Sequence, residues 1–263
     1  MPTRRHLLIM AAGSIWTAAS SPSVLAQAVP TIAAAADLKF ALDEIAARFR
    51  ADTGQDVKLT FGSSGNFTTQ LMQGAPFEMF LSADEGFVFR LADAGKTLDR
   101  GTLYAEGRIV LFAPKGSPLK PDGNFADLRA ALQDGRIQRF AIANPEHAPY
   151  GRAAEQALKG QGLWEAVLPK LVLGENVSQA AQFATSGSAQ GGIFAYSLAV
   201  SPEVSSLGSY ALISAEWHAP LRQRMVLIKN ASDIAKSFYA YIQSPGSRAI
   251  FRKYGFVLPG EAA

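Results

Sequence analysis

Short apolar runs alternate with longer amphipathic stretches along the chain from residue 29 onward. Short apolar runs are typical of strands, and an apolar residue at every third or fourth position is typical of a helix. The predicted strands, each followed by its predicted helix, are 31–36 and 37–53, 57–61 and 66–73, 78–81 and 83–94, and 140–144 and 151–160. A helix over 178–185 precedes a strand over 192–194. This alternation predicts an α/β fold with mainly parallel strands.

Two further apolar strands, 109–113 and 225–228, have similar flanks, with an arginine just before each and a lysine soon after. They bracket about 110 residues, which is the size of a small domain. A chain that leaves one lobe, builds a second and returns needs two such crossings. We therefore expect a discontinuous first lobe and a second lobe, with hinge motion near Ala113 and Ala219. The expected limits are 29–112 and 220–263 for lobe 1, with a helix over 233–243 packing back on it, and 113–219 for lobe 2.

The first 28 residues have the pattern of an export signal. Arg4 and Arg5 precede an apolar run over 7–16, and Ala26-Gln27-Ala28 forms an A-x-A cleavage site. The paired arginines favour a twin-arginine signal, although any basic start fits the general export route as well. The apolar run is shorter than the roughly 20 residues that a membrane span needs. We therefore expect a soluble protein exported to a bacterial periplasm.

Composition removes several classes of function. The chain has no cysteine, which excludes disulfides, thiol nucleophiles, cysteine metal sites and an acylated cysteine anchor. The formal net charge of +3 includes Arg4 and Arg5, so the rest of the chain is close to neutral and does not favour nucleic acid as a partner. The roughly 235 residues after the signal can bury a large core, in one domain or in two lobes.

Four strand-to-helix junctions are rich in small or turn-forming residues. They are Ala36-Asp37, Gly62-Ser63-Ser64-Gly65-Asn66, Pro149-Tyr150-Gly151 and Asn176-Val177-Ser178. In open α/β sheets, ligands bind beyond the carboxyl ends of strands, where helices begin. Each helix start offers unpaired N–H groups and the positive end of the helix dipole, and serine adds a neutral donor. Each junction alone is also compatible with an ordinary helix cap, but four that converge on one cleft would bind an oxyanion without lysine or arginine.

Catalytic interpretations have weaker support. The nucleophile elbow G-x-S-x-G fails because Asn66 stands at its last position, and the S-x-x-K match at 117–120 contains a proline with no K-T-G after it. His147 and His218 lie far apart outside any H-E-x-x-H pattern, and we expect His147 to order its own loop. Asp84-Glu85 is interpreted as a helix cap with first-turn charge. A secreted hydrolase using Ser64 stays an alternative, although the sequence shows no base beside it.

Several motifs, in this order and spacing, resemble the periplasmic molybdate-binding proteins of ABC importers over essentially the whole chain after the signal. They are A-A-A-A-D-L-K-F-A-L at 33–42, F-G-S-S-G-N-F at 61–67, G-A-P-F-E-M-F-L-S-A-D at 74–84, N-P-E-H-A-P-Y-G at 144–151, E-N-V-S-Q-A at 175–180 and F-R-K-Y-G-F at 251–256. The resemblance implies a periplasmic-binding-protein-like fold of two α/β lobes joined by two crossing strands. It implies a monomer that binds molybdate or tungstate in the cleft and delivers it to the importer's inner-membrane permease. It also implies no cofactor and no catalysis, with molybdenum present only as the oxyanion and no protein ligand to the metal itself.

Carried over by position, the ligand donors fall on Ser64 with Ser63 beside it, on Tyr150, on the N–H of Val177 and on Asp37. Many family members have serine or another neutral polar residue at the last of these positions. An ionised carboxylate about 4 Å from a dianion would cost roughly 8 kcal/mol at an effective dielectric near 20. We therefore expect the Asp37 side chain to cap its own helix while an N–H of this junction faces the anion.

A second departure concerns a ligand-contacting tyrosine of some family members, which aligns here with Ala195. Tyr196 lies one residue later and therefore on the opposite face of the strand. Tyr150 is then the candidate for the missing hydroxyl. These departures leave sulfate, phosphate or a small organic anion as alternative ligands. For phosphate, Asp37 is the evident acceptor of the ligand proton.

Overall fold

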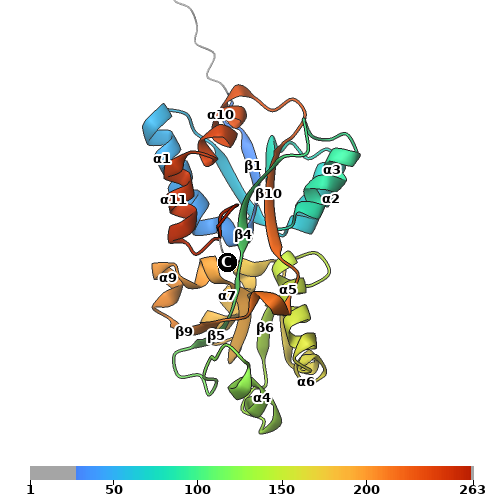
Figure 1. The fold of residues 1–263 in the computed structure, drawn as a ribbon, viewed down its shortest axis with the longest axis vertical. Helices are drawn as coiled ribbons and strands as arrows, with labels where there is room; N and C mark the ends of the chain where they lie inside the picture. The colour runs from blue at the N-terminus through green and yellow to red at the C-terminus, as the bar shows by residue number, and fades with distance from the viewer. Residues whose placement is uncertain (1–27, 262–263) are drawn as a thin grey trace, which may run out of the picture.

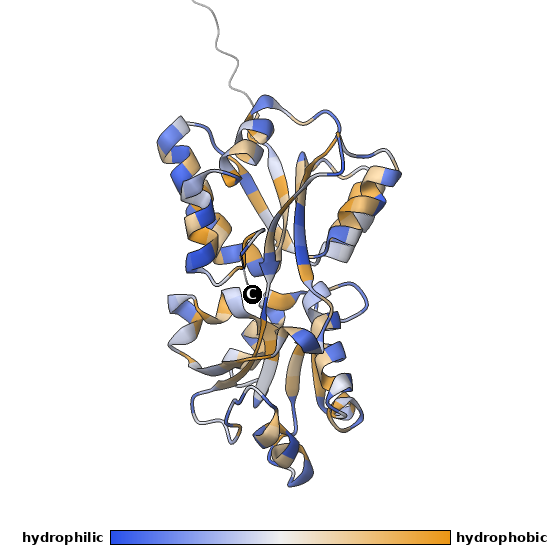
Figure 2. Ribbon diagram, in the orientation of Figure 1, coloured by the Kyte–Doolittle hydropathy of each residue, from blue (hydrophilic) through white to orange (hydrophobic). Residues whose placement is uncertain are grey.

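The computed structural model describes residues 28–261 and divides them into two lobes, each built on a five-stranded sheet with helices against it (Figure 1). Apart from Ala28, the predicted export signal lies outside the described residues. Helices of both lobes carry hydrophobic and hydrophilic residues on different sides (Figure 2). Within residues 28–261, no helix has the length and apolar character needed to cross a membrane.

The first sheet has the strand order β2-β1-β3-β10-β4. Its strands are β1 (Thr31–Ala35), β2 (Lys58–Gly62), β3 (Met79–Ser82), β4 (Thr102–Gly107) and β10 (Leu221–Leu227). The helices of this lobe are the 3-10 turn η1 (Ala36–Leu38), α1 (Lys39–Thr53), α2 (Ser64–Met72), α3 (Glu85–Asp93), α10 (Asp233–Ile242) and α11 (Pro245–Lys253). In β1, Ile32 and Ala34 belong to the main core, whereas Ala33 packs with Phe67 and Phe80 in a separate apolar cluster beside α2 and α3. Successive side chains of β1 point to opposite faces of the sheet, so this strand contributes to the apolar clusters on both faces.

The second sheet has the order β7-β6-β8-β5-β9. Its strands are β5 (Ile109–Pro114), β6 (Phe140–Ala143), β7 (Leu171–Gly174), β8 (Gly191–Ala195) and β9 (Gly208–Leu212). Its helices are α4 (Ala126–Gln133), α5 (Pro149–Gly160), α6 (Trp164–Val167), η2 (Leu168–Lys170), α7 (Val177–Thr185), α8 (Tyr196–Ala199), α9 (Pro202–Ser205) and η3 (Ala215–Trp217).

One strand of each sheet runs against the other four. Strand β10 is antiparallel to β3 and β4, and strand β5 is antiparallel to β8 and β9, while the central pairs β1–β3 and β6–β8 are parallel. In both sheets the reversed strand is the first strand along the chain after it has crossed from the other lobe. The predicted two-lobed α/β fold with mainly parallel strands is confirmed, with each sheet mixed in this way.

The first crossing lies earlier than the sequence predicted. Only Arg108 separates β4 from β5, and every partner of β5 belongs to the second sheet. We therefore propose Arg108, in place of residue 112, as the end of the first segment of lobe 1. The run 109–113 resembles a crossing strand because it is wholly apolar, but its burial comes from the core of lobe 2. The second predicted limit, between 219 and 220, directly precedes β10.

Candidate functional site

The four predicted junctions meet between the lobes around a small cavity. The space between atoms there amounts to about 190 Å3 and is partly open to solvent. The lining residues are Ala35, Ala36, Asp37, Gly62, Ser63, Ser64, Ala83, Ala148, Pro149, Tyr150 and Val177. All five predicted site residues are in this group, and all are buried. The structure thus brings them together from both lobes, while their role as ligands stays a prediction.

The start of α2 contributes two serines from the first lobe. Ser63 is the N-cap, and its hydroxyl accepts a hydrogen bond from the Asn66 N–H at 3.3 Å. Ser64 is fully buried, and its hydroxyl accepts from the Ala83 N–H at 3.0 Å. The hydroxyl proton of Ser64 is therefore available to another acceptor. As the first residue of α2, Ser64 also has an N–H without an intrahelical partner.

The starts of α5 and α7 contribute N–H groups from the second lobe. Asn176 caps α7, and its Oδ1 accepts from the N–H groups of Ser178 and Gln179 at 3.0 and 3.1 Å. The Val177 N–H is left without an acceptor among residues 28–261, and so is that of Tyr150, the second residue of α5. Free N–H groups of three helix starts thus surround one cavity, which is the arrangement that binds anions in other proteins.

Asp37 lies at the centre of a buried hydrogen-bond network. Its Oδ2 accepts from the Tyr150 hydroxyl at 2.9 Å and from Gln223 Nε2 at 2.6 Å. Gln223 Oε1 in turn accepts from the Tyr104 hydroxyl at 2.7 Å. The other oxygen, Oδ1, has no hydrogen-bond partner among the described residues. Burial raises the pKa of Asp37 to about 6, although the two hydrogen bonds oppose this effect.

Two expectations about these side chains are wrong. Asp37 caps neither η1 nor α1, because its carboxyl turns toward the buried donors of α5 and β10. The Tyr150 hydroxyl, the candidate for the missing ligand hydroxyl, donates to Asp37 instead. The N–H of Tyr150, which has no acceptor among residues 28–261, is then its candidate donor to the cavity.

The sequence reasoning missed Gln223 and Tyr104. Gln223 stands between two arginines and so resembles a surface residue, yet it is fully buried. A usable signal was present, because Leu221, Gln223 and Met225 are spaced by two and share one buried face of β10. Tyr104 offered no comparable signal.

His147 links the two lobes through the start of α2. Its Nδ1 lies 2.9 Å from the Ser63 hydroxyl, and its carbonyl oxygen accepts from the Gly65 N–H at 3.0 Å. Its Nε2 is 3.7 Å from the Glu175 carboxylate. We expected His147 to order its own loop, but its ring contacts Ser63 of the other lobe and Glu175. The serine beside the histidine is Ser63, whereas the hydrolase alternative invoked Ser64.

Further contacts close the lobes around the cavity. The Ser178 hydroxyl donates to the carbonyl oxygen of Ala36 at 2.8 Å, and the Ser197 hydroxyl donates to that of Asp37 at 2.8 Å. Arg152 pairs with Asp84 across the cleft at 2.5 Å. Asp84 also accepts from the Gly86 N–H, which confirms its predicted role as the cap of α3. The structure is therefore that of a closed form.

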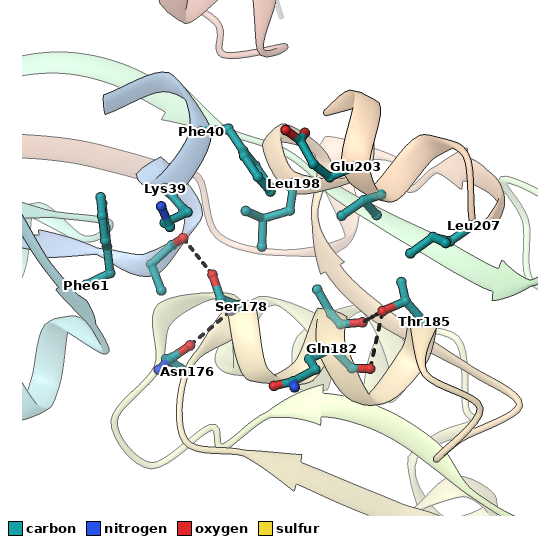
Figure 3. A pocket seen from close by; sticks show the side chains of 13 residues that line it. Lys39, Phe40, Phe61, Asn176, Ser178, Gln182, Thr185, Leu198, Glu203 and Leu207 are labelled. Atoms are coloured by element: carbon teal, nitrogen blue, oxygen red, sulfur yellow. Dashed lines mark hydrogen bonds between the residues drawn. The ribbon is translucent and has the colours of Figure 1, made fainter. Parts of the chain in front are cut away.

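A larger groove is lined by residues of α1 and α7, among others (Figure 3). Ala36 lines both spaces, and the Ser178 contact with its carbonyl oxygen lies at their border. Lys39 and Glu203 are the only charged residues that line the groove. The remainder of its lining is largely apolar, including Phe40, Phe61, Leu198 and Leu207.

The small cavity offers an anion neutral hydrogen-bond donors and no cation. No lysine or arginine lines it, and Asp37 is its only acidic residue. Residues 28–261 contain no group of three or more histidine, aspartate or glutamate side chains placed to hold a metal ion. Hydrogen-bond donors and helix starts are what the cavity offers.

Two α/β lobes closed on a buried cavity of hydrogen-bond donors define the class of two-lobed ligand-binding proteins. Residues 30–257 match the model of the bacterial extracellular solute-binding proteins, and the chain belongs to that family. It is 37% identical to the molybdate-binding protein ModA of Rhodobacter capsulatus over 228 residues, 86% of each chain. It is 33% identical to the ModA of Azotobacter vinelandii over 257 residues, 97% of each chain. The solved periplasmic molybdate-binding protein of Azotobacter vinelandii superposes with a TM-score of 0.78 at 30% identity, covering 88% of this chain and 99% of that chain.

Proposed function

We propose that this protein is the substrate-binding component of an ABC importer that captures molybdate or tungstate between its lobes and delivers it to the permease. The observation that carries the proposal is the convergence of three helix starts on one cavity without a cation. The names of the relatives support molybdate as the ligand. The protein works as a monomer in the periplasm, catalyses no reaction and binds no nucleic acid.

The proposed donors are the hydroxyl groups of Ser63 and Ser64 and the N–H groups of Ser64, Tyr150 and Val177. A hydrogen bond to a charged partner contributes about 1.5–3 kcal/mol, so this set accounts for binding in the micromolar to nanomolar range, which needs roughly 8–12 kcal/mol. Asp37 is the one acidic residue of the lining. Molybdenum enters only within the oxyanion.

A calorimetric titration of the mature protein, freed of bound anion, tests this function. We expect one-to-one binding of molybdate and tungstate and no heat with sulfate or phosphate. Ser64→Ala should lose about 1 kcal/mol or more of binding free energy, because a buried donor to the anion is removed. Ser209→Ala, at an exposed serine of the edge strand β9, is the matched control and should bind as the wild type does.

Other outcomes would redirect the assignment. Binding of phosphate alone would make the protein a phosphate carrier and Asp37 an acceptor of the ligand proton. The Ser63–His147 contact is the one observation that favours a hydrolase. Turnover of an activated ester that disappears in Ser63→Ala would support that alternative, but the Ser63 hydroxyl already accepts from the Asn66 N–H as a helix cap.

A further inference from the structure

Asp37 is the only acidic residue that lines the cavity, and its hydrogen bonding is one-sided. Oδ2 receives both donors, from Tyr150 and Gln223. Oδ1 is buried and receives none from the described residues. A buried carboxyl oxygen without a hydrogen bond costs folding free energy. A bound ligand or a proton on the oxygen would remove this cost. The cavity that Asp37 lines is where that partner can stand.

The groups that face Asp37 do not compensate its charge. Tyr150 from α5 and Gln223 from β10 bond to its carboxyl, and the Ser197 hydroxyl from α8 bonds to its backbone oxygen. Tyr104 from β4 contacts Gln223. Burial raises the pKa of both tyrosines well above the usual value, so both are neutral at physiological pH. No positive charge among the lining residues offsets an ionised carboxylate beside a dianion.

We propose that the site takes up one proton together with each dianion, and that this proton lies between Asp37 Oδ1 and an oxygen of the bound oxyanion. The proton comes from solvent, and no covalent bond to the central atom changes. A carboxyl that donates to the dianion and a carboxylate that accepts from the singly protonated anion hold the same number of protons. The inference rests on the proposed function, since it needs an oxyanion in this cavity.

The proton makes binding depend on pH in a defined direction. Above the pKa of about 6 the free protein carries an ionised Asp37, so the complex must gain a proton on forming. Linkage then requires the affinity to fall about tenfold for each pH unit between pH 7 and 9. Molybdate is a dianion throughout this range, so the free ligand adds no proton of its own.

The test is a calorimetric titration with molybdate at pH 8 in two buffers of different ionisation enthalpy. The wild type should take up close to one proton per anion bound. Asp37→Asn keeps the size of the side chain, and its amide can donate, so this variant should take up no proton and bind independently of pH. Asp37→Ser is a second neutral variant in case the amide disturbs folding. Asp43→Asn removes an exposed carboxylate of α1 and should behave as the wild type does.

Each contrary result has one meaning. Tight binding by the wild type without proton uptake would overturn this inference and leave the proposed function standing. Proton uptake that persists in both Asp37 variants would also overturn it. A wild type that binds none of the four anions would remove the proposed function, and this inference with it.

Discussion

The hydroxyl of Tyr150 lies 2.9 Å from Oδ2 of Asp37 and joins the second lobe to the first inside the cavity. Gln223 Nε2 lies 2.6 Å from the same oxygen and 3.0 Å from the Tyr150 hydroxyl, so the three side chains form a closed triangle. Gly107 makes room for it, because a Cβ there would stand 2.1 Å from the Tyr150 hydroxyl. The carboxyl of Asp37 is therefore held in place in the closed form.

Tyr150→Phe should weaken the closed form in a pH-dependent way. The change removes one donor from a buried carboxylate and keeps the ring. We expect the free energy of unfolding to fall by about 1–3 kcal/mol at pH 8, because a hydrogen bond to a charged group is lost. The loss should be smaller at pH 5, where Asp37 is protonated. Urea unfolding at both pH values measures it, with Tyr210→Phe at a part-exposed tyrosine of β9 as the control. Equal losses at both pH values would contradict an ionised Asp37 at pH 8.

Asp37→Asn should stabilise the free protein relative to the wild type as the pH rises. The folded pKa of about 6 exceeds the ordinary aspartate pKa of 3.8, so the folded state binds the proton more tightly. The stability from this group is complete below pH 4 and is lost as the pH rises through 6. The wild type should lose about 3 kcal/mol of unfolding free energy from this group as the pH rises. Asp37→Asn has no carboxyl to titrate and should not show this loss. The measurement is the difference in unfolding free energy between variant and wild type at pH 4 and pH 7. A difference that does not change with pH would show that Asp37 titrates normally.

The local sequence predicted the inner strands, β10 only over its second half, and the edge strand β2, but it missed the other three edge strands. Strands β1, β3, β6 and β8 were predicted within two residues, because each is a short apolar run beside turn residues. The missed strands β4, β7 and β9 all lie at a sheet edge. An edge strand has one neighbour and an exposed side, so its sequence carries a weaker apolar pattern. Its conformation depends on a partner that is distant in the chain.

In the candidate site, too, the locally encoded features were predicted and the long-range contacts were not. The helix starts at Ser64, Tyr150 and Val177 were predicted, because turn and cap residues mark a helix start locally. The direction of the Tyr150 hydroxyl was not, since its acceptor Asp37 lies 113 residues earlier and in the other lobe. Gln223 is more distant still from Asp37 in the chain. These contacts depend on how the two lobes pack against each other. No local sequence pattern encodes that packing.

Ser178→Ala should reduce the affinity for molybdate by favouring the open form. The Ser178 hydroxyl holds the start of α7 to the carbonyl oxygen of Ala36, and it makes no other hydrogen bond to the described residues. Loss of a hydrogen bond of ordinary strength corresponds to about threefold to tenfold weaker binding. Thr185→Val is the control on the same helix, because the Thr185 hydroxyl bonds only within α7. Calorimetry of both variants decides, and equal affinities would show that this contact does not contribute to closure.

Gly65→Ala should prevent full closure while leaving each lobe folded. A Cβ at Gly65 would stand 2.6 Å from the carbonyl oxygen of His147, which is backbone and cannot turn aside. The start of α2 must then move away from the second lobe, and the 3.0 Å hydrogen bond from the Gly65 N–H is lost. We expect molybdate to bind at least about tenfold more weakly. The donors at the start of α2 would no longer reach the anion together with the donors of the second lobe. Gly246→Ala is the control, since Gly246 holds the same second position in α11 and its nearest neighbour is 3.9 Å from the added carbon. Small-angle X-ray scattering with molybdate present should show a larger radius of gyration for Gly65→Ala alone. A compact Gly65→Ala complex with unchanged affinity would mean that the lobes can close without this contact.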